Sequence, residues 1–221
     1  MTEPFGFLLA FSGDHTGDIR FALSEGADAL RWRVLRDSAG VLRGGSEPFL
    51  ARAESGEIVC LASTAGGVVV WTTADLETWD GPRPLPAAPA GAHRDALLPA
   101  VAASSASAAL GVDGPRAALL HAGGAVHTFR AEGGTLVQER DGALVKHGIA
   151  GGDAAIVFAG LGGRTWYLLA ATPDGLRPYV TRNLAGGAWQ PAGADGMPAG
   201  ARRGGVVTVT EDEFKRLESH A

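Results

Sequence analysis

The sequence has little cysteine, no long apolar run and no excess of positive charge, and each absence excludes a class of protein. The single cysteine, Cys60, cannot form an intramolecular disulfide, and its apolar surroundings predict a small buried side chain. No apolar run approaches the roughly 18 residues that a membrane-spanning helix needs. The net charge is −5, so we expect no nucleic-acid partner and no membrane partner, because either would need a basic face.

The first residues also lack the features of a targeting signal. The segment MTEPFGFLLAFSGDH carries an acidic residue and a proline, and its short apolar stretch has no basic residues before it. We therefore expect a cytoplasmic protein.

Helical periodicity is almost absent, and short apolar runs take its place. The chain has 33 glycines, and clusters of Gly, Asp, Pro or Ser separate the apolar runs 7–11, 58–62, 68–71, 117–120, 155–158, 166–170 and 206–209. Many short strands with regular turn signals are typical of a sandwich, a barrel or a propeller. A hydrophobic fraction of 46% is enough for a core.

An internal repeat favours the propeller among these folds. Segments 20–35, 69–85 and 178–192 each contain a strand, a turn with small residues that is also acidic in the first two segments, and then a tryptophan with a second strand. The tryptophans are Trp32, Trp79 and Trp189, so the gaps are 47 residues and 110 residues, or two steps of 55. The doubled gap predicts a fourth unit, which segment 126–140 fits. This period is typical of propeller blades, and we expect the tryptophans to be core residues.

The C-terminal end of the sequence predicts how the blades are completed. Residues 205–210 (GVVTVT) form a strong strand pattern, and the first unit has only about three strands of its own. We expect this last strand to complete the N-terminal blade and so to close the ring. Thr210 and Glu213 have the spacing of a capping box, which predicts a short C-terminal helix. The sequence therefore predicts one all-β domain over residues 1–221, a β-propeller of four-stranded antiparallel blades.

Several segments resemble the family 43 glycoside hydrolases of the arabinofuranosidase and xylosidase type. These are residues 6–32, 46–63 and 68–85 and, most specifically, the closing segment MPAGARRGGVVTVTEDEFKRL at 197–217. The resemblance covers most of the chain. It implies five blades, of which four units are countable. It also implies sugar chemistry in which one carboxylate activates water, a second protonates the leaving oxygen and a third tunes the second.

Position by position, the resemblance implies an altered set of acids. The family's general base falls on Glu47 in Ser46-Glu47-Pro48-Phe49, where an acid is kept but is one methylene longer. Ala100 replaces the tuning acid, and Gly152 replaces the general acid. Asp153 follows directly, but side chains alternate along a strand, so it points inward only if a bulge re-aims it.

Two arginines and two loops complete the candidate site. The resemblance places Arg203 where the family has a histidine that helps to hold a cation, so we expect no metal and no other cofactor. Glu47 is either a carboxylate that faces the centre or a structural partner of Arg203 or Arg202. The remaining candidates are loop residues, which could instead be solvated turn residues: Asp14, His15, His93, Arg94 and Asp95.

Four functions remain open from the sequence. The first is a carbohydrate-binding or polar-ligand-binding relative without standard hydrolysis, because two of the three acids are missing. The second is a glycosidase that uses Glu47 as base and Asp153 or Asp14 as acid. The third is a repurposed bacterial enzyme of small-molecule metabolism, and the fourth is a protein-interaction propeller.

Overall fold

The protein is represented by a computed structural model that describes ten stretches of the chain. They are residues 3–13, 17–36, 41–53, 55–64, 67–84, 116–121, 125–132, 135–143, 155–182 and 189–221. Within these stretches, no helix has both the length and the apolar character needed to cross a membrane.

The described residues form antiparallel strands and one short helix, which confirms the prediction of a β-rich fold. The first eight strands are β1 (Pro4–Ser12), β2 (Asp18–Ser24), β3 (Trp32–Val34), β4 (Val41–Arg43), β5 (Ser46–Arg52), β6 (Ile58–Thr64), β7 (Gly67–Thr73) and β8 (Asp80–Pro84). The others are β9 (Arg116–His121), β10 (Ala125–Glu132), β11 (Thr135–Ala143), β12 (Ala155–Ala159), β13 (Trp166–Thr172), β14 (Gly175–Thr181), β15 (Gln190–Pro191) and β16 (Arg203–Thr210). Helix α2 (Glu211–Glu218) follows β16 directly.

The strands form three sheets. The N-terminal sheet has the order β16-β1-β2-β3, with β4 also paired to β2. The second sheet, β5-β6-β7-β8, is a four-stranded antiparallel meander of the predicted kind. The third sheet has seven strands in the order β11-β10-β9-β12-β13-β14-β15.

The third sheet differs from the predicted separate four-stranded blades. Strands β9 and β12 pair through only two residue pairs, Ala155 with Leu120 and Ile156 with Leu119. This short contact joins two meanders, β9–β11 and β12–β15, into one sheet. An edge strand has unpaired N–H and C=O groups, and pairing with a neighbouring edge satisfies them.

The C-terminal strand completes the N-terminal sheet, as predicted. Strand β16 pairs antiparallel with β1 from Pro4 opposite Thr210 to Ser12 opposite Arg203. Helix α2 then begins at the predicted capping box. The Thr210 side chain accepts the N–H of Glu213, and the Glu213 side chain accepts the N–H of Thr210.

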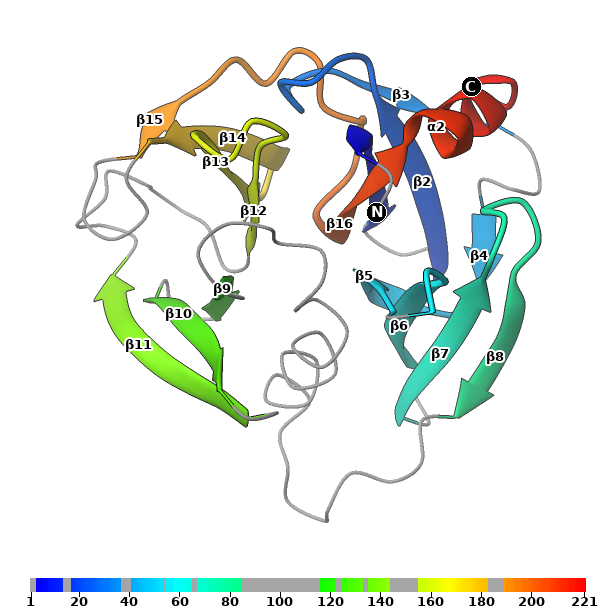
Figure 1. Ribbon diagram of the computed structural model, residues 1–221, viewed down its shortest axis with the longest axis horizontal. Coiled ribbons are helices and arrows are strands. Elements are labelled where there is room, and N and C mark those ends of the chain that lie inside the picture. Colours follow the sequence, from blue (N-terminus) through cyan, green and yellow to red (C-terminus); the bar gives the residue numbers. More distant parts are fainter. Residues whose placement is uncertain are drawn as a thin grey trace.

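The strand groups lie around the middle of the molecule, with β5, β9, β12 and β16 nearest to it (Figure 1). Strand β16 contacts both β5 and β12, so strands from all three sheets meet there. Such a radial arrangement is what a propeller requires. The closed ring and the number of blades stay predictions, because segments between the sheets lie outside the described residues.

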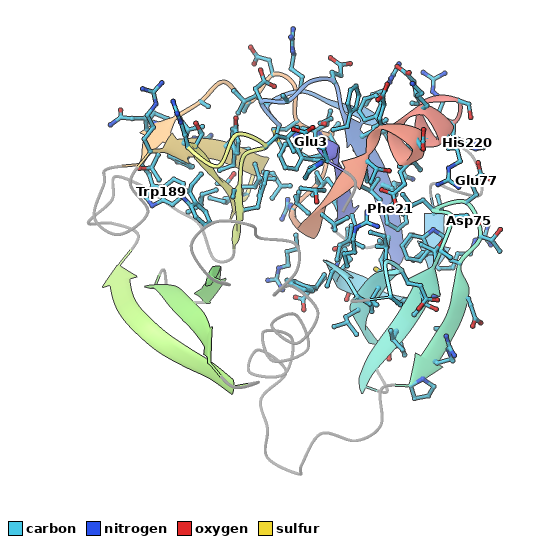
Figure 2. All side chains as sticks on the ribbon, in the orientation of Figure 1. Glu3, Phe21, Asp75, Glu77, Trp189 and His220 are labelled. Atoms are coloured by element: carbon cyan, nitrogen blue, oxygen red, sulfur yellow. The ribbon has the colours of Figure 1, made fainter. Side chains whose placement is uncertain are left out.

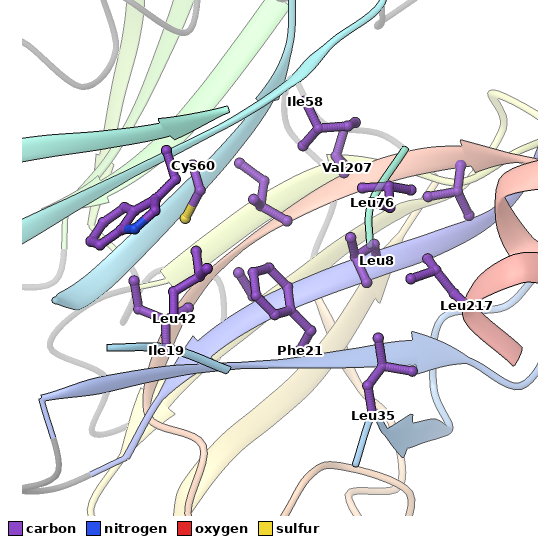
Figure 3. Close-up of a cluster of buried hydrophobic side chains, with 14 of the residues drawn as sticks. Leu8, Ile19, Phe21, Leu35, Leu42, Ile58, Cys60, Leu76, Val207 and Leu217 are labelled. Carbon is purple, nitrogen blue, oxygen red and sulfur yellow. The ribbon is translucent and has the colours of Figure 1, made fainter. Parts of the chain in front are cut away.

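Two apolar clusters hold the sheets together. The first lies between the N-terminal sheet, the second sheet and α2, and Figure 3 shows members from each, including Leu8, Ile58 and Leu217. Cys60 belongs to this cluster, as predicted, and burial raises the pKa of its thiol far above the usual range. The second cluster joins the N-terminal sheet to β12, β13 and β14 through side chains such as Leu9, Phe158 and Leu169.

Two of the repeated tryptophans are buried core residues, as predicted, and the third, Trp79, is half-buried and packs against the first cluster. Trp79 stacks on Phe21 of β2 with ring centroids 5.1 Å apart, so it joins the second sheet to the N-terminal sheet. Trp32 is buried in the second cluster and donates its indole N–H to the carbonyl of Ala29 at 3.0 Å. Trp189 is also buried. The indole N–H of Trp79 is buried and has no hydrogen-bond partner among the described residues.

The Trp79 stack gives a pair of stability predictions. We expect Trp79→Ala to lower the free energy of unfolding by about 3 kcal/mol, because it removes a large side chain between two sheets. Trp79→Phe should remain within about 1 kcal/mol of the parent, because it keeps an aromatic ring and removes an N–H group that makes no hydrogen bond. Urea denaturation measures both changes. An equal loss in the two variants would contradict this account of the stack.

Candidate functional site

Three of the predicted site residues lie in the described part of the chain: Glu47, Arg202 and Arg203. The others lie outside it, namely Asp14, His15, His93, Arg94, Asp95 and Asp153, together with the replaced positions Ala100 and Gly152. The candidate site is therefore built from the strands that carry Glu47 and Arg203.

Strands β5 and β16 lie side by side although they are edge strands of different sheets. Three contacts join them in the same order along both strands: Glu47 with Arg203, the backbone of Phe49 and Leu50 with Gly205, and Arg52 with Thr208. Because residue numbers rise together, the two strands run in the same direction where they meet. This is the relation expected of the innermost strands of two sheets arranged around one axis.

Glycine at position 205 makes this close approach possible. A Cβ there would lie 2.5 Å from the backbone nitrogen of Leu50 and 2.8 Å from the Cα of Phe49. Because those are backbone atoms, no side chain can rotate to make room. The bare backbone of β16 therefore rests directly on β5, and Arg203 comes to lie beside Glu47.

Glu47 occupies an irregular position in β5. The register with β6 shifts between Ser46 and Phe49, which places Glu47 in a β-bulge. Its φ of 52° lies in the left-handed region that residues other than glycine rarely adopt. The following residue is Pro48, which has no N–H to donate. Strain of this kind is concentrated at functional sites and persists only where the surroundings impose it.

The Glu47 carboxylate forms an ion pair with the guanidinium group of Arg203. The Glu47 side chain is 18% exposed and that of Arg203 is 41% exposed, so the pair is open to solvent mainly through the arginine. Arg202 points elsewhere and donates to the carbonyl of Pro173 at 2.8 Å. The structure thus pairs Glu47 with Arg203, one of the two arginines that the sequence offered as its partner.

This arrangement can recognise a polar ligand. The ion pair joins Arg203 Nη1 to Glu47 Oε1, one of the two carboxylate oxygens. The exposed guanidinium presents N–H donors, and the carboxylate beside it offers acceptors. Among the described residues, no group of three or more His, Cys, Asp and Glu side chains is placed to hold a metal ion.

A second charged contact, which the sequence did not predict, lies further along the same two strands. Arg52 donates from Nη1 to Glu213 Oε1 at 2.9 Å and from Nη2 to Glu213 Oε2 at 2.8 Å. Arg52 also donates to the carbonyls of Gly56 and Thr208. The capping-box pattern gave the role of Glu213, but no local pattern marks its partner. We use the name Arg52–Glu213 clamp for this ion pair together with the hydrogen bond between Glu213 and Thr210.

The clamp holds Glu213 ionised. Burial disfavours the charged carboxylate, but the hydrogen bonds from Arg52 and from the backbone of Thr210 outweigh it and lower the pKa of Glu213 below 4.5. The same contacts connect β5, β16 and α2. The clamp is therefore a structural device beside the candidate site.

The carboxylates of Asp75 and Glu77 stabilise the turn between β7 and β8, and neither belongs to the candidate site. The Asp75 carboxylate accepts the backbone N–H groups of Thr78 and Glu77, and these bonds lower its pKa. Glu77 then lies 3.6 Å from His220 at the end of the chain (Figure 2). These contacts fasten the turn and the C-terminus to each other.

No protein-family model matches the chain, and no curated protein or solved structure matches it either. The resemblance to family 43 glycoside hydrolases thus rests on the residues quoted for it.

Proposed function

We propose that the chain is a cytoplasmic, glycoside-hydrolase-like propeller that binds a carbohydrate or another polar small molecule at its centre without standard glycoside hydrolysis. The observation that carries this proposal is the ion pair between Glu47 and Arg203. It lies between the edge strands of two sheets, and its acid is the one that the resemblance assigns to the general base.

The ion pair supports binding of a ligand rich in hydroxyl groups. A sugar hydroxyl both donates and accepts hydrogen bonds, and the pair offers an acceptor beside exposed donors. Charged partners make the stronger hydrogen bonds of a binding site. The loss of hydrolysis is supported by the sequence, in which Ala100 and Gly152 stand where the resemblance expects two further acids.

The proposal predicts binding without turnover. We expect the parent protein to bind one or more of arabinose, xylose and galactose in isothermal titration calorimetry. We also expect no nitrophenol release above buffer from the corresponding aryl glycosides. Glu47→Gln and Arg203→Gln should each weaken the binding at least about tenfold, because each removes a charged hydrogen-bonding group.

Arg33→Gln is the matched control for this experiment. The Arg33 side chain is 40% exposed, close to the 41% of Arg203, and forms an ion pair with Glu218 at the end of α2. We expect the variant Arg33→Gln to leave sugar binding unchanged. Absence of binding to all three sugars would overturn the carbohydrate-binding part of the proposal. Nitrophenol release that disappears in Glu47→Gln would instead show a working glycosidase with rearranged acids.

A further inference from the structure

Ser12 contacts both strands of the candidate site, namely β5, which carries Glu47, and β16, which carries Arg203. We call these two strands the two halves of the site. Ser12 is the last residue of β1 and is only 6% exposed. On one side it is the cross-strand partner of Arg203 in β16, and on the other side it is the partner of Ile19 in β2. No pattern in the sequence marks this serine.

Two hydrogen bonds of Ser12 each reach the backbone of one half of the site. Its hydroxyl oxygen accepts the N–H of Glu47 at 3.1 Å, which crosses from the N-terminal sheet to the second sheet. Its carbonyl oxygen accepts the N–H of Arg202 at 3.1 Å, one residue before Arg203. One residue therefore ties the backbone at Glu47 to the backbone beside Arg203.

The first of these bonds supports the strained conformation of Glu47. The bulge takes the Glu47 N–H out of the regular pairing with β6, and Pro48 cannot donate. A buried N–H without a partner is costly, so the backbone needs an acceptor at this point. A residue before proline is also restricted in conformation, and a left-handed φ there has to be held by contacts from outside the strand.

We propose that Ser12 is a positioning residue of the site. Its hydroxyl group holds Glu47 in the conformation in which the carboxylate faces Arg203. The effect of Ser12 on ligand binding rests on the proposed function. Its effect on the backbone of Glu47 does not.

The test compares Ser12→Ala with Ser12→Thr, which keeps the hydroxyl group. Ser24→Ala is the matched control, because Ser24 is a buried serine of the same sheet whose hydroxyl accepts the backbone N–H of Phe7 at 3.0 Å. Amide hydrogen exchange, followed residue by residue by NMR, reports the backbone bond. Calorimetry with the sugar that the parent binds reports the site.

We expect Ser12→Ala to speed exchange of the Glu47 amide roughly tenfold, in line with the loss of one hydrogen bond, and to weaken sugar binding. Ser12→Thr should restore both. Ser24→Ala should speed exchange at Phe7 and leave Glu47 and the binding unchanged. The inference would be overturned if the Glu47 amide exchanged at the parent rate in Ser12→Ala. It would also be overturned if Ser24→Ala sped exchange of the Glu47 amide as much as Ser12→Ala does. The expected exchange pattern in a parent that binds no sugar would support the positioning role and overturn the proposed function alone.

Discussion

Replacing Glu213 with alanine should lower the free energy of unfolding by about 3 kcal/mol. The substitution leaves Arg52 without its carboxylate in a site where the two side chains are 22% and 11% exposed. Removing one partner of a buried pair is strongly destabilising, because the other charge stays desolvated. The loss of the capping box contributes about 1 kcal/mol of this total. Urea denaturation measures the change.

Glu211→Ala is the control for this prediction. Glu211 lies in the same first turn of α2, but its ion pair with Lys215 is exposed on both sides. Exposed pairs contribute little, so its loss should stay below about 1 kcal/mol. Equal losses in the two variants would mean that the clamp adds nothing beyond an ordinary charge at the start of a helix.

The clamp also predicts how stability depends on pH. The folded-state pKa of Glu213 lies below its ordinary value of 4.5, so its contribution to stability is fully present above pH 4.5 and is lost as the pH falls through the folded-state pKa. Glu213→Gln cannot ionise and lacks this contribution. The difference in unfolding free energy between the parent and Glu213→Gln should be largest near neutral pH and shrink as the pH falls below 4.5. A difference that stays constant with pH would rule out the ionised clamp as its source.

Gly205→Ala should lower the free energy of unfolding by a similar amount, about 3 kcal/mol. The new Cβ would meet backbone atoms of Phe49 and Leu50, so the strands β5 and β16 must move apart. Because Glu47 and Arg203 lie two residues earlier on these strands, the same shift should also weaken any ligand that the pair binds. Thermal or urea denaturation measures the first effect, and calorimetry measures the second.

Gly193→Ala separates this steric effect from the general effect of replacing a glycine. A Cβ at Gly193 meets no atom within 4 Å. Alanine there reduces the conformational freedom of the unfolded chain, so we expect no loss of stability and a gain of up to about 1 kcal/mol. Comparable destabilisation at both positions would contradict the close approach of β5 and β16.

The features that the sequence predicted well are carried by local or repeated patterns. The capping box of α2 depends on two residues three positions apart, and the tryptophans could be found because their unit recurs. The pairing of β16 with β1 followed from counting strands in the first unit. Glu47 and Arg203 came from the resemblance, and a pairing of Glu47 with Arg203 or Arg202 was one of the alternatives left open.

The features that the sequence could not predict depend on distant residues or on local strain. Arg52 and Glu213 are 161 residues apart, and no periodic pattern connects them. The left-handed backbone of Glu47 contradicts the usual preference of glutamate before proline, so propensity argues against it. The joining of β9 to β12 depends on which strand edges meet in space. Each of these is decided by tertiary structure.

The pairing of β1 with β16 has a consequence for how the protein is made. A ribosome produces β2 to β15 after β1 and before its neighbour β16, so the N-terminal sheet cannot be completed until all of these strands have been synthesised. Throughout that time the apolar side chains of β1, Phe7 to Phe11, lack the strand that lies beside them in the finished fold. A permuted gene that encodes β16 directly before β1 would shorten this delay, because the two strands would then form a local hairpin.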